Sequence, residues 1–140
     1  MLFFVFVLSF IGIVMSTNDP IISFTVYGEP ASKANSRQIV MIGKRPAVIK
    51  SKKARDYVKS FKLQCPRLNP LLTEDVSVTI TIYYASRRPD LDESVILDAM
   101  QGEEFIYKND RQVKEKHIFH ALDKDNPRAE IEIRLRHVKE

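Results

Sequence analysis

Hydrophobic and polar residues alternate along several stretches of the chain, and this period of two residues predicts β-strands. In the first stretch, Ile22, Phe24 and Val26 alternate with their neighbours, and the turn-forming Gly28 and Pro30 follow. The same alternation, bounded by turn residues, predicts further strands over 38–42, 46–49, 76–84 and 129–138. The sequence therefore predicts a β-sheet protein with short connections.

Two features refine the strand prediction. The stretches 38–42 and 46–49 turn at Gly43 and Lys44, which predicts a β-hairpin. Farther along, the segments EFIYKNDRQV and KHIFHAL predict a strand pair or an extended region over 104–122. The last strand follows a turn formed by Asp125, Asn126 and Pro127.

Apolar residues at helical spacing predict two helices between these strands. The first helix follows Ser51 and covers 52–63, with most of its lysines away from an apolar face formed by Ala54, Tyr57, Val58, Phe61 and Cys65. The second is short, fades at Gly102, and carries the apolar stripe Val95, Ile96, Ala99 and Met100. Helices interspersed with strands predict an α/β (α+β) fold, a small domain with a mixed sheet and two main helices.

The apolar N-terminus is a separate feature. Residues 2–14 contain no charged side chain, but the run is shorter than the ~20 residues that a transmembrane helix needs. A secretory signal peptide would carry Lys or Arg before its apolar core, and none is present. We therefore interpret 1–14 as an extension or leader, predict a working domain over 15–140, and expect it in the cytoplasm. A signal peptide or membrane attachment is the alternative interpretation.

Composition narrows the class of protein. The 140 residues, 44% of them hydrophobic and 29% charged, describe one globular domain. Lys and Arg outnumber Asp and Glu by 22 to 18, a net charge of +4 that favours a polyanionic partner. A single cysteine excludes an intramolecular disulfide, and three histidines argue against a zinc cluster. Any metal ion is therefore expected on carboxylates.

The segment RRPDLDESVILDAM, residues 87–100, places two aspartates at the start of the second helix. One interpretation is structural, with Asp92 capping the helix and Asp90 in a turn that begins at Pro89. The other is chemical, because residues separated by one intervening residue in an extended segment project the same way and could share a hard cation. Asp110 in YKNDRQV would then be the third ligand. Basic residues flank both places, as a site for metal and phosphate requires: Arg87, Arg88, Lys108 and Arg111.

The segments RRPDLD, ILDAMQG and IYKNDRQV, in this order, resemble the signature of RusA-type Holliday junction resolvases, a family of metal-dependent endonucleases often carried by prophages. FTVYGEPASKANSR resembles the family's first strand and basic loop, and NPRAEIEI its last strand, so the resemblance covers about residues 21–136. It implies a RusA-like fold, with Asp90, Asp92 and Asp110 as the catalytic, metal-binding triad.

The chain also departs from the family pattern. The family commonly has Asn after its second aspartate and a catalytic Lys one turn later, whereas Glu93, Ser94, Val95 and Ile96 stand here. The interval from Asp92 to the aspartate of LDAM is shorter by about two residues, which indicates a variant branch. Supporting roles fall to four residues: Glu93 as an extra ligand, Asp98 as a ligand or the partner of a base, and Lys108 or Arg111 as the missing cation.

The acids and bases predict hydrolysis of a phosphodiester by Mg²⁺, with Mn²⁺ as a substitute. The resemblance implies a nuclease that resolves four-way DNA junctions during recombination and repair. The near two-fold symmetry of such a junction predicts a homodimer. The residues expected to bind DNA are Lys33, Arg37, Arg87 and Arg88. Two alternatives stay open: a nuclease for other branched DNA, and a non-catalytic nucleic-acid-binding module that uses the basic helix 52–63.

Overall fold

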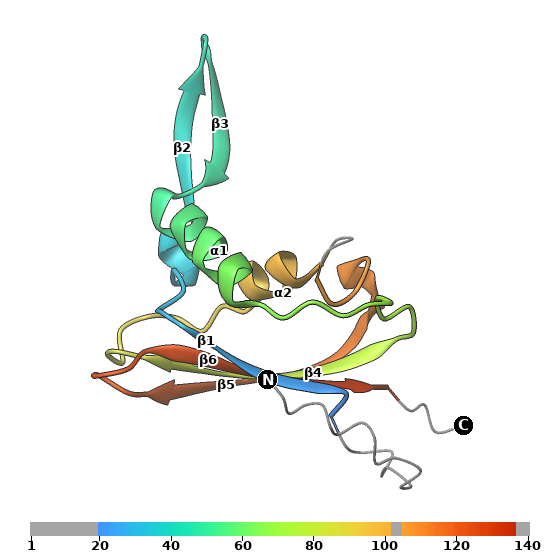
Figure 1. The fold of residues 1–140 in the computed structure, drawn as a ribbon. Helices are drawn as coiled ribbons and strands as arrows, with labels where there is room; N and C mark the ends of the chain where they lie inside the picture. Colours follow the sequence, from blue (N-terminus) through green and yellow to red (C-terminus); the bar gives the residue numbers. More distant parts are fainter. Residues whose placement is uncertain (1–19, 102–104, 137–140) are drawn as a thin grey trace, which may run out of the picture.

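The strands predicted from alternation form a mixed sheet and a separate hairpin. The structure, a computed structural model, describes residues 20–101 and 105–136 (Figure 1). One sheet has four strands in the order β1-β6-β4-β5, and β2 and β3 pair only with each other. The strands are β1 (Ile22–Tyr27), β2 (Arg37–Ile42), β3 (Arg45–Lys50), β4 (Val76–Tyr84), β5 (Val113–Leu122) and β6 (Arg128–Leu135). The α+β prediction with a mixed sheet is confirmed.

The four-stranded sheet supplies most of the core. Its central strand β4 pairs antiparallel with β6 and parallel with β5, and β1 pairs antiparallel with β6. Alternation places Val78, Ile80 and Ile82 of β4 on the helix-facing side, where they are fully buried. Opposite them on β6, Ile131 and Ile133 are buried as well. The apolar faces of β4 and β6 therefore lie where the period of two predicted them.

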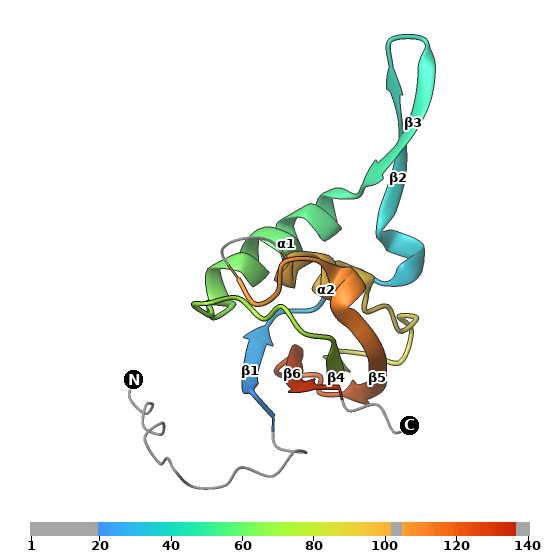
Figure 2. The same ribbon diagram turned by 90° about the vertical axis from the view of Figure 1, so that its right-hand side faces the viewer.

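Two helices cover one face of this sheet (Figure 2). They are α1 (Lys52–Gln64) and α2 (Ser94–Met100), and two short 3-10 turns accompany them, η2 (Lys33–Asn35) and η3 (Asp110–Gln112). The Oγ of Ser51 accepts a hydrogen bond from the Ala54 amide at 3.2 Å, which caps α1. At the other end, the amide group of Gln64 both donates to and accepts from the backbone of Tyr27, which fixes α1 to β1.

The β2–β3 hairpin projects away from the sheet and helices (Figure 1). Its register pairs Ile42 with Arg45, so only Gly43 and Lys44 form the turn. Gly43 has a φ of 65°, a left-handed conformation that glycine adopts without the steric cost of a Cβ atom. The predicted hairpin is confirmed, and each strand is slightly longer than the alternation indicated.

The region 104–122 differs from its prediction. Residues 113–122 form β5, but the preceding segment adds no paired strand: Tyr107 makes isolated bridges to Leu72 and Gln101, and η3 follows. The physical reason is a capping box, in which the Asn109 side chain and the Gln112 side chain satisfy each other's backbone amides and hold a turn. The expected end of the second helix, Gly102, lies outside the described residues.

Two further predictions concern membrane attachment and the start of the working domain. Among the described residues, none of the helices is both long and apolar enough to cross a bilayer. Residues 1–14, interpreted as an extension or leader, lie outside the described part of the chain. The working domain over 15–140 stays a prediction.

Candidate active site

The acidic segment that follows β4 is held in place by the last residue of that strand. Tyr84 is fully buried, and its hydroxyl donates to the backbone carbonyl of Asp90 at 3.3 Å. Burial raises the pKa of Tyr84 to about 12, and the carboxylates of Asp92, Glu29 and Asp90 add to the rise. The hydroxyl therefore stays protonated at neutral pH and can keep donating to the segment.

Asp90 itself is exposed and lines a cavity of about 570 Å³. Arg87 and His120 line the same cavity, and His120 stacks on the ring of Tyr84 with 4.8 Å between ring centroids. A carboxylate, a guanidinium group and an imidazole thus share one opening at the end of β4 and β5.

Asp92 lies in a different environment, because its side chain is only 8% exposed. Its Oδ1 accepts from the backbone amide of Ser94 at 3.0 Å and from the Ser94 hydroxyl at 2.8 Å. The predicted cap is wrong in its position, because Glu93 is the N-cap residue of α2 and makes no side-chain cap bond. Asp92 lies one residue earlier, where its carboxylate still satisfies one of the free amides at the start of the helix. Asp92 also lines a second cavity, of about 470 Å³, together with Lys33 and Arg37. The contact with Ser94 and a role in this cavity are compatible.

The two cavities meet at Leu91, which lines both. Asp90 and Asp92 therefore flank this residue, each on its own cavity, rather than sharing one opening. Both cavities contain arginine from the set predicted to bind DNA, Arg87 in the first and Arg37 in the second. Carboxylates and cations that are distant in sequence are thus brought side by side.

Asp110 begins η3, on the other side of α2. Its backbone amide donates to the side chain of Gln101, the residue that ends α2, at 2.9 Å. Asp92 lies before the first residue of the same helix, and seven residues at 1.5 Å each span about 10 Å. The backbone of Asp110 is therefore anchored at the opposite end of α2 from Asp92.

The described residues contain no group of three or more His, Cys, Asp or Glu side chains close enough to hold one metal ion. Carboxylate oxygens are the donors that Mg²⁺ prefers, so the donor chemistry of Asp90, Asp92 and Asp110 fits this ion. The geometry described here does not converge them on one point. The three-aspartate metal site stays a prediction.

The supporting acids have partners of their own. Glu93 accepts from Nζ of Lys116, a β5 residue, at 2.7 Å. Oδ2 of Asp98 lies 3.9 Å from Nζ of Lys50 at the base of the hairpin, so this aspartate does face a base, as one of its two interpretations predicted. These pairs are partly exposed and connect the motif to β3 and β5.

The predicted cations remain on the surface. Lys33 and Arg37 lie at and after η2, and Arg87 and Arg88 lie in the loop after β4; all four are exposed. Lys108 and Arg111, exposed as well, flank Asp110, and among the described residues neither has an acidic side chain as an ion-pair partner. The side chain of Arg111 is held near the turn by Asn109 Oδ1.

Glu29 and His120 are two further polar residues near the motif that no sequence pattern indicated. Glu29 accepts from the Ala85 amide at 2.7 Å and lies 3.7 Å from Nζ of Lys53, so it connects the first loop to the end of β4. His120 reaches Tyr84 because β5 pairs with β4 in parallel, with Ile82 opposite His120. Neither position has a local sequence signal, because both depend on strand pairing. Cys65 is buried, and burial raises the pKa of its thiol to about 12.

The sequence matches the family described as Endodeoxyribonuclease RusA over residues 28–134. The match begins just before η2 and ends within β6, so it includes the hairpin, both cavities and all three aspartates. No curated protein matches the chain.

Proposed function

The chain belongs to the RusA endodeoxyribonuclease family, and from this premise we propose that it cuts four-way DNA junctions by hydrolysis that depends on Mg²⁺. Its role would be in DNA recombination and repair. The family itself implies an endodeoxyribonuclease, a hydrolase of phosphodiester bonds, with branched DNA as its substrate. The identity of the ion, the residues of the site and the dimeric state are our proposals.

The observation that carries the proposal is the cavity shared by Asp92, Lys33 and Arg37. A carboxylate at 8% exposure would normally pair with a cation or a metal ion, because burial penalises its charge. Here it forms no ion pair within the described residues, although two exposed cations line the same space. A cavity lined by a buried carboxylate and two exposed cations suits a metal cation and a phosphate together.

Each group has a separate role in the proposed site. Lys33, Arg37, Arg87 and Arg88 would bind the phosphate backbone and orient it. Asp90, Asp92 and Asp110 would hold the divalent ion if binding draws their carboxylates together, since they are apart in the structure described. The ion would supply a bound water of lowered pKa and would stabilise the charge on the phosphate. Tyr84 would act as a positioning residue, because its hydroxyl holds the backbone of Asp90. Lys108 and Arg111 are the candidates for the cation that the family has on its helix.

A cleavage assay tests this function. The full chain is incubated with end-labelled four-way junction or with linear duplex of the same sequence, in Mg²⁺ or in EDTA. We expect paired symmetric nicks in the junction, no cleavage of the duplex, and binding without cleavage in EDTA. Equal cleavage of both substrates would contradict the resolvase assignment. Binding without cleavage in any divalent ion would instead identify a nucleic-acid-binding module.

Asp110→Asn tests the proposed third ligand, because Asp110 shares no local element with the other two aspartates. The substitution preserves shape and removes one negative charge, so binding should be kept while cleavage falls by about a hundredfold or more. Asp125→Asn, in an exposed turn, is the matched control and should cut like the parent protein. Near-normal cleavage by Asp110→Asn would remove this residue from the site.

A homodimer is part of the proposal, because two opposed strands of a junction must be nicked. One active site in each of two symmetric subunits accounts for this with a single chain. Sedimentation equilibrium of the full chain should therefore give twice the monomer mass. A monomer at the concentrations at which junctions are cut would contradict the symmetric arrangement.

A further inference from the structure

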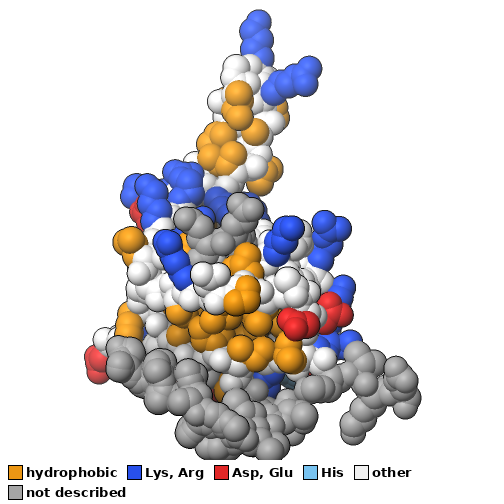
Figure 3. All heavy atoms as spheres, turned by 45° about the vertical axis from the view of Figure 1, so that its right-hand side comes forward, with side chains coloured by type: hydrophobic (Ala, Val, Ile, Leu, Met, Phe, Trp, Pro, Cys, Tyr) orange, Lys and Arg blue, Asp and Glu red, His pale blue; other side chains and the backbone are white. Residues whose placement is uncertain are grey.

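The β2–β3 hairpin exposes an unusual amount of apolar surface for an element that projects from the domain (Figure 3). Its four large exposed apolar side chains are between 63% and 73% accessible: Ile39, Met41, Ile42 and Val48. Neither strand joins the four-stranded sheet. Apolar side chains gathered on a projecting element are typical of a surface that contacts a partner.

The register of the hairpin places three of these side chains, Ile39, Met41 and Val48, on one face. Directly opposed residues of an antiparallel pair lie on the same face. Ile39 is opposite Val48, and Met41 is opposite Pro46, so one face carries two successive apolar pairs toward the tip. The same face has Arg37 opposite Lys50 at its base. The two apolar pairs thus lie between Arg37 and Lys50, where the hairpin begins, and Lys44 at its tip.

Charge identifies the class of partner. Between Pro30 and Arg55 the chain has eight Lys or Arg residues and no Asp or Glu. A second copy of this hairpin would bring like charges together, which disfavours pairing of one hairpin with another. Nucleic acid supplies the opposite charge in its backbone and apolar faces in its bases. The combination of cations with Met, Ile and Pro is the one found in proteins that insert side chains between base steps.

We propose that the hairpin is a wedge for the branch point of DNA, with the Met41 and Pro46 pair inserted where base stacking is interrupted. This rests on the proposed function, since the partner is the same branched DNA. Insertion requires that neighbouring bases be unstacked, and a base whose stacking is already broken is displaced at the lowest cost. The apolar pair therefore favours the branch point over continuous duplex.

The wedge and the cations have different effects on selectivity. Lys44, Arg45 and Arg37 contact phosphates, which branched and linear DNA share, so they strengthen both complexes and make both depend on salt. The apolar pair contributes only where bases can be separated. Selectivity for the junction thus comes from uncharged side chains, and affinity in general comes from the cations.

Met41→Ser isolates the wedge, because it removes an exposed apolar side chain and leaves every charge in place. Its matched control is Leu63→Ser on α1, which removes an apolar side chain that is 89% exposed at another site. Binding is measured in EDTA by fluorescence anisotropy, with four-way junction and linear duplex. A 2-aminopurine base at the branch point reports unstacking by a rise in fluorescence.

For Met41→Ser we expect junction affinity to fall by about tenfold and the 2-aminopurine signal to disappear, while duplex affinity stays within about twofold. Leu63→Ser should match the parent in all three measurements. Normal junction affinity and a normal 2-aminopurine signal in Met41→Ser would overturn the wedge. So would a change from dimer to monomer in Met41→Ser, because the hairpin would then cover a second copy of the chain.

Cleavage of the junction by the parent protein in Mg²⁺ is measured in parallel and separates the two proposals. If the parent cuts junctions and Met41→Ser binds them normally, the wedge alone is overturned. If junction binding depends on Met41 but the parent cuts nothing, the wedge is supported and the nuclease function is overturned.

Discussion

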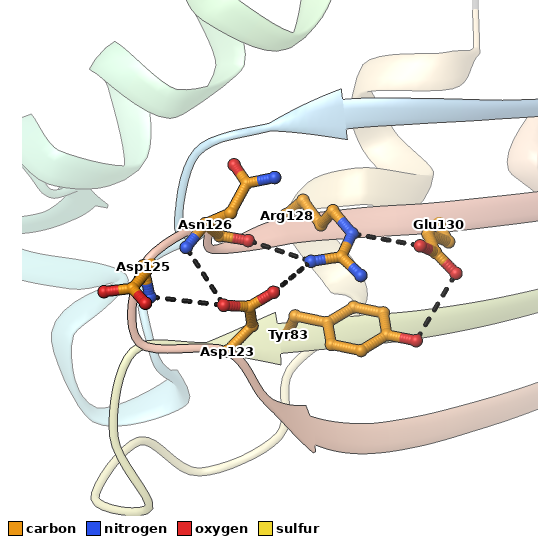
Figure 4. A network of polar contacts seen from close by, with 6 residues as sticks. All are labelled: Tyr83, Asp123, Asp125, Asn126, Arg128 and Glu130. Carbon is orange, nitrogen blue, oxygen red and sulfur yellow. Dashed lines mark hydrogen bonds and ion pairs between the residues drawn. The ribbon is translucent and has the colours of Figure 1, made fainter.

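The hairpin and the outer face of the sheet both expose charged side chains on paired strands, but they arrange these charges differently. The outer face, which points away from α1 and α2, carries both acids and bases. On it the Arg128 guanidinium contacts Asp123 at 2.7 Å and Glu130 at 3.0 Å, and lies 3.8 Å from the centre of the Tyr83 ring (Figure 4). Arg134 contacts Glu132 at 2.8 Å on the same strand.

The hairpin has no acids with which to form such pairs. Among the described residues, only its basal Lys50 has an ion pair, with Asp98, and Arg37, Lys44 and Arg45 have none. Charges paired within a fold attract external ions weakly, whereas a group of like charges attracts a polyanion. Arg128 and Arg134 of the outer face therefore find their acidic partners within the domain, whereas the cations of the hairpin are suited to an acidic partner molecule.

The largest expected effect concerns burial. Ile80→Ala in β4 removes a fully buried side chain and should lower the free energy of unfolding by about 2–5 kcal/mol. Ile39→Ala in the hairpin makes the same chemical change at a site that is 73% exposed, and should stay within about 0.5 kcal/mol of the parent. Urea denaturation measures both. A large loss in Ile39→Ala would show that the hairpin is packed in solution and is not an exposed element.

A smaller effect is expected for single charges. Arg37→Gln should reduce the slope of the logarithm of junction affinity against the logarithm of salt concentration by about 0.9, the value for one lost phosphate contact. Arg134→Gln also removes one positive charge, but its partner Glu132 lies on the outer face, so the slope should not change. Anisotropy titrations over a series of salt concentrations provide both slopes. Equal reductions would place the DNA path over the sheet as well.

The smallest effect concerns the Arg128 cluster. The hydrogen bond from Arg128 lowers the pKa of Asp123, with help from the amides of Asn126 and Asp125. A carboxyl whose pKa is lowered by folding stabilises the fold above its ordinary pKa, and this contribution is lost as the pH falls through the lowered value. Arg128→Gln should therefore raise the pKa of Asp123 in an NMR titration and flatten the acid side of the stability curve. The control Arg134→Gln should leave the pKa of Asp123 unchanged.

The sequence predicted those parts of the fold that follow from local periodicity. Alternation identified β1, β4 and β6, because each has one face on the core and one in solvent. Ser51 identified the start of α1, since its hydroxyl satisfies a free helix amide. Strand order was beyond this approach: β5 runs parallel beside β4, and its alternation is the same for either neighbour and either direction.

The same distinction between local and non-local information holds for the candidate site. Asp90, Asp92 and Asp110 were found from their residue types and spacing, and the resemblance to a known family assigned them a role. Their environments could not be predicted, because the burial of Asp92 and the bond from Asp110 to Gln101 depend on the three-dimensional fold. The same limit applies to the cavity that Asp92 lines together with Lys33 and Arg37, because these residues come from segments that are distant in sequence.

The two-residue turn at Gly43 has a consequence for the evolution and engineering of the hairpin. A φ of 65° at Gly43 and no positive φ at Lys44 are typical of a turn that closes two strands without a bulge. Adding or removing one facing pair within the hairpin would move the side chains between that point and the tip to the opposite face. Adding or removing two pairs would keep them on the same face. The length of the hairpin can therefore be changed in steps of about 7 Å without altering the domain that carries it.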